Sequence, residues 1–208
     1  MIYLSFGASC QPAYQIRRVT GDPVAYFFDW LITTREALRY CLREFDPDSF
    51  LAREPELCDG NMRVLDSASG IKFQHDFPSQ AGRIDPMLIA PSVAAVREKY
   101  LRRRERLLAK LAGNCVAIRY EWGGASFAAN ERQAMTSFRG SFEGLPGGQR
   151  LFVLASEDVS ATRVEDDQLY FRLAKYAGPE GDRWKGDDAS WNALFRMATE
   201  IMISLPEA

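Results

Sequence analysis

The chain has 208 residues, 47% of them hydrophobic, and its 26 basic and 28 acidic side chains give a formal net charge of −2. This length and apolar content suffice for one domain with a buried core, and the balanced charge gives no electrostatic reason to expect nucleic acid or an anionic membrane as a partner. The four cysteines are scattered without a CxxC pair and there is a single histidine, so the usual spacing of a zinc site is missing and no metal or other cofactor is expected.

The cysteines and the N-terminal segment favour a cytoplasmic location. Disulfides are not expected in a chain that can build its own core. No stretch approaches the roughly 18 apolar residues of a membrane span, and the sequence does not open on a basic region followed by a long apolar run. We therefore expect a cytoplasmic protein with reduced thiols and no membrane partner.

Hydrophobic periodicity predicts the regular elements of the first half of the chain. Ser9 is expected to cap the first helix, Thr33 or Thr34 the second, and residues 46–61 to form a loop. In chain order, the expected elements are a strand, a helix, a buried aromatic cluster, a second helix and the two strands of a β-hairpin, at residues 2–6, 10–18, 26–31, 33–45, and 62–65 with 71–77.

The second half continues the alternation of helices and strands. Its expected elements are a helix capped by Ser92, a strand, a helix, two strands and a final helix, at residues 92–112, 115–120, 128–142, 151–155, 169–173 and 187–205. This order predicts an α/β fold, a single domain over residues 1–208 with a largely parallel sheet flanked by helices. The hairpin near residues 62–77 is expected as an insertion or an edge.

Cys10 lies where the first strand turns into the first helix. A helix N-terminus carries unpaired backbone N–H groups and the positive end of the helix dipole, which stabilise a thiolate and can receive an oxyanion. Cys10 is therefore a candidate nucleophile. The alternative is that it fills the strand-to-helix corner as a small hydrophobic side chain.

His75 is the only possible base of its kind in the chain. Strand alternation would place it on one face with Ile71, Phe73 and Phe77, which is typical of a core histidine. A catalytic role requires His75 to lie near the end of the strand, where Pro78 lets the chain turn away. A distance of at most about 4 Å between the Cys10 sulfur and a ring nitrogen would favour a thiol enzyme.

Three aspartates could orient the imidazole by accepting its other N–H. Asp76 is adjacent to His75 but would point to the opposite face of a strand. Asp29 lies in an aromatic cluster, where an acid needs a partner, and Asp158 follows the strand at residues 151–155, where α/β folds commonly place functional groups. Spacing does not select among them.

Four short motifs in order resemble a known family. They are SFGASCQPA at residues 5–13, FDWL at 28–31, HDF at 75–77 and an arginine-rich helix at 100–106. Together they resemble a bacterial family classed as papain-like cysteine peptidases and mostly known as a domain of unknown function. The resemblance implies a Cys-His site at Cys10 and His75 with Asp29 or Asp76 as the acid, and a papain-like α+β arrangement as the alternative fold.

Two functions are predicted from these patterns. The first is a cysteine hydrolase, either a peptidase or an acyl hydrolase or transferase, acting on a peptide or acyl-type substrate through Cys10 and His75. The alternative is a non-catalytic α/β domain that binds a small anionic ligand such as a sugar phosphate or nucleotide-sugar. That alternative predicts anion binding near Arg17, Arg18 or Arg103, with Cys10 packed away from solvent.

Overall fold

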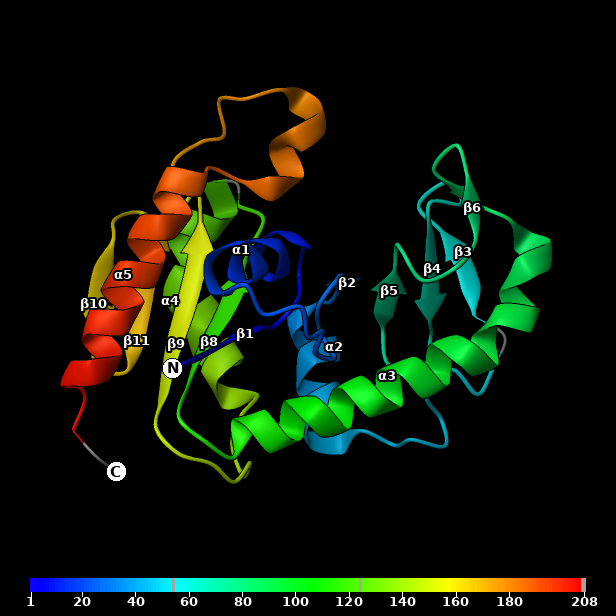
Figure 1. The fold of residues 1–208 in the computed structure, drawn as a ribbon, viewed down its shortest axis with the longest axis horizontal. Helices are drawn as coiled ribbons and strands as arrows, with labels where there is room; N and C mark the ends of the chain where they lie inside the picture. The colour runs from blue at the N-terminus through cyan, green and yellow to red at the C-terminus, as the bar shows by residue number, and fades with distance from the viewer. Residues whose placement is uncertain (54, 124, 207–208) are drawn as a thin grey trace.

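A computed structural model describes residues 1–53, 55–123 and 125–206, and a five-stranded sheet lies at its centre (Figure 1). The strand order is β1-β8-β9-β11-β10; the first four strands run parallel and β10 is antiparallel to β11. The strands are β1 (Ile2–Ser5), β8 (Cys115–Tyr120), β9 (Arg150–Ser156), β10 (Arg163–Glu165) and β11 (Gln168–Arg172).

Helices cover both faces of this sheet, as its nearly uninterrupted apolar central strands require. Along β8 every residue is buried, and successive side chains enter two different cores. The helices are α1 (Gln11–Thr20), α2 (Arg35–Arg39), α3 (Ile89–Leu111), α4 (Ala125–Gly140) and α5 (Asp188–Ser204). In Figure 1, α1 and α5 lie on one face and α4 on the other. None of the helices in the described ranges is long and apolar enough to cross a membrane.

A smaller antiparallel sheet lies beside the main body (Figure 1), with the strand order β2-β5-β4-β3. Its strands are β2 (Leu31–Ile32), β3 (Glu56–Cys58), β4 (Arg63–Asp66) and β5 (Ile71–Phe73), and a two-stranded ribbon of β6 (Ser79–Gln80) and β7 (Arg83–Ile84) follows. Helix α3 has 23 residues and is therefore about 35 Å long. It runs from the small sheet to the large one, and Tyr100 packs edge-on against Phe73 with ring centroids 5.2 Å apart.

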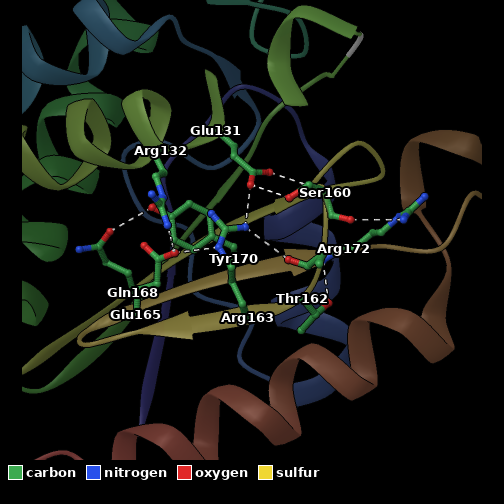
Figure 2. Close-up of polar contacts among 10 residues, drawn as sticks. Glu131, Arg132, Ser160, Thr162, Arg163, Glu165, Gln168, Tyr170 and Arg172 are labelled. Carbon is green, nitrogen blue, oxygen red and sulfur yellow. Dashed lines mark hydrogen bonds and ion pairs between the residues drawn. The ribbon is translucent and has the colours of Figure 1, made fainter. Parts of the chain in front are cut away.

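A charged cluster braces the edge of the large sheet at β10 and β11 (Figure 2). The Arg163 guanidinium lies over the Tyr170 ring, 3.7 Å from its centroid, and pairs with Glu131 at 2.7 Å and Glu165 at 2.8 Å. Glu131 also accepts hydrogen bonds from the backbone N–H and the hydroxyl of Ser160. These contacts tie α4 to the segment between β9 and β11, and a charged edge disfavours pairing with another chain.

The α/β fold predicted from the sequence is confirmed, but several boundaries differ. Cys10 rather than Ser9 occupies the N-cap of α1, while the Ser9 hydroxyl accepts from the Gln11 N–H at 3.2 Å. Helix α3 begins before the predicted cap because a 3-10 turn capped by Asp85 leads directly into it, and the Ser92 hydroxyl donates to the Leu88 carbonyl inside the helix.

The second helix and the predicted loop also differ from expectation. Thr34 does cap α2 by accepting from the Ala37 N–H, but the helix continues as a π-helical turn, Tyr40–Glu44. The region predicted as a loop at residues 46–61 contains β3, whose pairing with β4 has no strong signal in the local sequence.

Candidate active site

The turn between β1 and α1 positions Cys10. Gly7 and Ala8 both adopt left-handed backbone conformations, with φ of 76° and 64°. A Cβ atom on Gly7 would lie 2.1 Å from the Thr33 hydroxyl oxygen, so this position requires glycine for both its φ and its space. The Ala8 N–H donates to the same hydroxyl at 3.3 Å. The turn thus holds the thiol at the carboxyl end of β1.

His75 approaches from the small sheet. Strand β5 ends at Phe73, and the chain then bends, so the predicted alternation stops before His75. Ile71, Phe73 and Phe77 are buried as expected, but His75 is exposed, and the prediction that it shares their face is wrong. Its Nε2 lies 3.5 Å from the Cys10 sulfur, within the limit of about 4 Å expected for a thiol–imidazole pair.

A cavity of about 810 Å³ surrounds this pair, outside the carboxyl ends of β1 and β8. This is the edge at which α/β sheets commonly bind ligands. Cys10 is partly exposed there. The wall combines aromatic, cationic and other polar side chains, and its lining comprises Ala8, Ser9, Cys10, Trp30, Ile32, Arg63, Gln74, His75, Asp76, Lys99, Arg103, Trp122 and Trp184.

The electrostatics of the cavity favour a neutral thiol. Burial raises the pKa of Cys10 to about 11; Arg63 opposes this rise, and the carboxylates of Asp76 and Asp29 add to it. The helix N-terminus was expected to stabilise a thiolate, whereas desolvation of the sulfur disfavours the charged form. Cys10 is therefore protonated at neutral pH, and the nearby Nε2 of His75 is placed to accept the thiol proton.

Asp76 lines the cavity, but its carboxylate is bound to helix α3. It pairs with Lys99 at 2.5 Å and accepts from the Tyr100 hydroxyl at 2.9 Å, and its side chain is 5% exposed. These contacts anchor the segment that carries His75. Within the described ranges no carboxylate is hydrogen-bonded to the His75 ring, and the Trp30 ring lies edge-on to it with centroids 6.3 Å apart.

Asp29 and Asp158 lie outside the cavity. Asp29 is buried, accepts from the Tyr26 N–H at 2.9 Å and faces a smaller pocket with Arg17. Burial raises the pKa of Asp29 to about 6, against the opposing effects of that hydrogen bond and of the Arg17 and Arg103 charges. Asp158 follows β9 and its backbone N–H donates to the Ser156 hydroxyl at 3.1 Å. The structure thus brings together Cys10, His75 and Asp76, and not these two aspartates.

Several lining residues could not be selected from the sequence. Three of the four tryptophans, Trp30, Trp122 and Trp184, meet here from different parts of the chain. Trp122 and Trp184 are 57% and 41% exposed, and Trp30 has a left-handed φ of 69°. Neither exposure nor φ has a signature in the local sequence, although strained residues are common at functional sites.

A second pocket of about 390 Å³ adjoins the first, and the two share Ala8, Ile32 and Trp122 as lining. It is mostly polar. Glu121, on its wall, pairs with Arg119 at 2.7 Å and with Arg35 at 3.1 Å. The cavity around Cys10 therefore continues past Trp122 into a charged recess.

Within the described ranges no group of three or more histidine, cysteine or acidic side chains is arranged to hold a metal ion. Comparisons of the chain with models of protein families, with curated proteins and with solved structures find no match.

Proposed function

We propose that this protein is a cysteine hydrolase or acyltransferase in which Cys10 is the nucleophile and His75 the general base, related to the peptidase family that its motifs resemble. The observation that carries the proposal is the 3.5 Å contact between the Cys10 sulfur and His75 Nε2 inside a cavity large enough for a substrate.

The neutral thiol requires the base to act during attack. His75 Nε2 takes the sulfur proton as the sulfur forms a bond to the substrate carbonyl carbon. The resulting imidazolium returns the proton to the leaving group as the bond to that group breaks, which leaves a thioester on Cys10. Water, or a second nucleophile, then attacks the thioester with His75 again as the base, and Cys10 recovers its proton.

The start of α1 supplies the means to stabilise the oxyanion. Cys10 is the N-cap residue, so the positive end of the helix dipole lies beside the sulfur. The backbone N–H of Gln11 already donates to the Ser9 hydroxyl. We therefore assign the Cys10 N–H as the oxyanion donor.

Two further observations favour the thiol enzyme over a non-catalytic binding domain. The binding domain predicts a Cys10 packed away from solvent, whereas Cys10 is partly exposed and lines the cavity. In addition, Ala8 and Trp30, both with left-handed φ, lie on the cavity wall. Strain of this kind costs about 1–3 kcal/mol per residue and is concentrated at functional sites.

The test is acylation by p-nitrophenyl acetate, followed by the release of p-nitrophenolate and by mass spectrometry of the Cys10 peptide. The wild-type protein should form an acetyl thioester on Cys10. Cys10→Ala should form none there, and His75→Gln should react about 100-fold or more slowly, the usual contribution of a general base. Circular dichroism checks that both variants remain folded.

Cys58→Ala is the matched control, because Cys58 is also partly exposed but lies outside the cavity. It should react like the wild type. The proposal fails if Cys10 is acylated no faster than Cys58, or if His75→Gln matches the wild type.

A further inference from the structure

The charged side chains on the cavity wall are mostly basic. Arg63, Lys99 and Arg103 line it together with a single carboxylate, that of Asp76. Lys99 and Arg103 are four residues apart on α3, so they share one face of that helix. A partly desolvated cavity with such an excess of cations attracts an anionic group.

Two of the three cations already have partners. Lys99 pairs with Asp76 at 2.5 Å, and Arg63 pairs with Asp59 at 2.7 Å. Arg103 differs from both. It makes no ion pair within the described ranges, and its guanidinium carbon lies 4.9 Å from the centroid of the Tyr100 ring.

Arg103 also carries an unsatisfied donor. Its Nη1 is buried without a hydrogen-bond partner in the described part of the chain. The buried Asp29 carboxyl interacts with Arg103 only electrostatically, without a hydrogen bond or ion pair. The buried Nη1 does not face the cavity, so a ligand would be bound by the part of the guanidinium that lines it. A planar guanidinium matches the two oxygens of a carboxylate or phosphate.

The aromatic side chains indicate the rest of the ligand. Trp30 and Trp184 lie edge to face with centroids 6.4 Å apart, and Trp122 is exposed at the boundary with the adjoining pocket. Tryptophan faces offer contact area to flat or apolar groups. The cavity therefore combines an aromatic wall with one available guanidinium.

We propose that the acyl substrate carries an oxyanion group, a carboxylate or a phosphate, which Arg103 binds while the aromatic wall holds an apolar part of the substrate. This inference rests on the proposed function, because it assigns the substrate class of the Cys10 site. Arg103 acts as a specificity-determining residue, because the charges of Lys99 and Arg63 are already balanced by their own carboxylates.

The test compares two reagents that alkylate the same sulfur and differ in charge, iodoacetate and iodoacetamide. The rate of alkylation of Cys10 by iodoacetate is divided by its rate with iodoacetamide, both measured by peptide mass spectrometry at pH 8. This ratio is then divided by the same ratio for N-acetylcysteine amide. In the wild type the resulting quotient should be about ten, as one charge-assisted hydrogen bond to the carboxylate would produce. Arg103→Met should bring it close to one, and Arg103→Lys should retain part of it.

Arg106→Met is the matched control, an exposed arginine of the same helix that does not line the cavity. It should leave the quotient unchanged. A second arm measures protection of Cys10 from iodoacetamide by inorganic phosphate and by succinate, which identifies the preferred oxyanion. Protection should be lost in Arg103→Met.

The outcomes separate the two proposals. If Cys10 reacts with both reagents at the quotient of a free thiol, and neither anion protects it, the anionic substrate is excluded while the thiol enzyme stands. If Cys10 reacts with neither reagent while Cys58 does, the thiol enzyme fails and the substrate assignment falls with it.

Discussion

The thiol of the candidate site lies 3.5 Å from the imidazole, but its surroundings do not ionise it as a helix N-terminus alone would suggest. Burial raises the pKa of Cys10 to about 11, and the nearby Asp76 and Asp29 carboxylates act in the same direction. Because the neutral form is favoured, the reactivity of Cys10 near pH 7 depends on proton transfer to His75 rather than on a standing thiolate.

We predict a distinctive pH dependence of Cys10 alkylation by iodoacetamide. With His75→Gln, the rate constant should rise about tenfold per pH unit from pH 7 to about pH 10, because the thiolate fraction rises in that proportion below the pKa. The wild type should react faster than the variant near pH 7. Its rate constant should approach that of the variant at higher pH, where the thiolate forms without the help of His75. Peptide mass spectrometry measures both rates, and a wild-type rate that is flat from pH 6 to pH 9 would indicate a preformed thiolate instead.

The β1–α1 turn is the element on which the candidate site depends most directly. Its left-handed residues, Gly7 and Ala8, let the chain turn from the strand so that Cys10 begins the helix. Thr33, just after β2, closes against this turn and accepts the Ala8 N–H. The turn therefore joins the large sheet to the small one at the point where the sulfur is held.

Gly7→Ala should destabilise the protein by about 3 kcal/mol, since it adds a Cβ at a positive φ and against the Thr33 hydroxyl. It should also slow Cys10 acylation by displacing the sulfur. Urea unfolding and the p-nitrophenyl acetate assay provide the two measurements. Gly21→Ala is the matched control, because Gly21 has a similar φ of 69° with nothing within 4 Å of a Cβ, and it should cost only about 1 kcal/mol. Equal losses would show that the Thr33 contact is unimportant.

At the scale of the whole molecule, the candidate site lies between two sheets, and Arg119 joins them. Arg119 is 1% exposed, and its guanidinium donates to the Phe6 carbonyl at 2.7 Å and to the Thr33 carbonyl at 2.9 Å, while also pairing with Glu121. Phe6 precedes the turn that carries Cys10. Thr33 follows β2, and β2 pairs with β5, the strand that leads to His75. Arg119 thus fixes one half of the site relative to the other.

Arg119→Met should lower the free energy of unfolding by about 3–5 kcal/mol. It leaves two buried carbonyls without the hydrogen bonds that Arg119 donates, and it removes the closest partner of Glu121. Arg35→Met is the comparison, since Arg35 pairs with the same Glu121 from a more exposed position, and its loss should cost about 1 kcal/mol or less. Urea unfolding of the three proteins decides the point. Similar values for both variants would mean that the Arg119 contacts do not join the sheets.

The regular elements with strong local patterns were predictable. The strand at residues 115–120 coincides with β8, and Asp187 caps α5 by accepting from the Ser190 N–H, within one residue of the predicted start. Short strands such as β3 were missed because they are held by cross-strand pairing rather than by local propensity. The face assigned to His75 was wrong because a bend after Phe73, invisible in the alternation, ended the strand early.

The sequence by itself determined which groups are available: one thiol at a strand-to-helix turn, one histidine to serve as its base, and an alternation of helices and strands that favours a parallel sheet. Only the tertiary structure decided that these two residues, 65 positions apart, lie 3.5 Å from one another, that Asp76 is bound by Lys99 and Tyr100, and that Arg103 keeps an unpaired donor. The physical reason is that periodicity records the environment of a residue along its own element, whereas distance, burial and pKa depend on which distant segments pack against it.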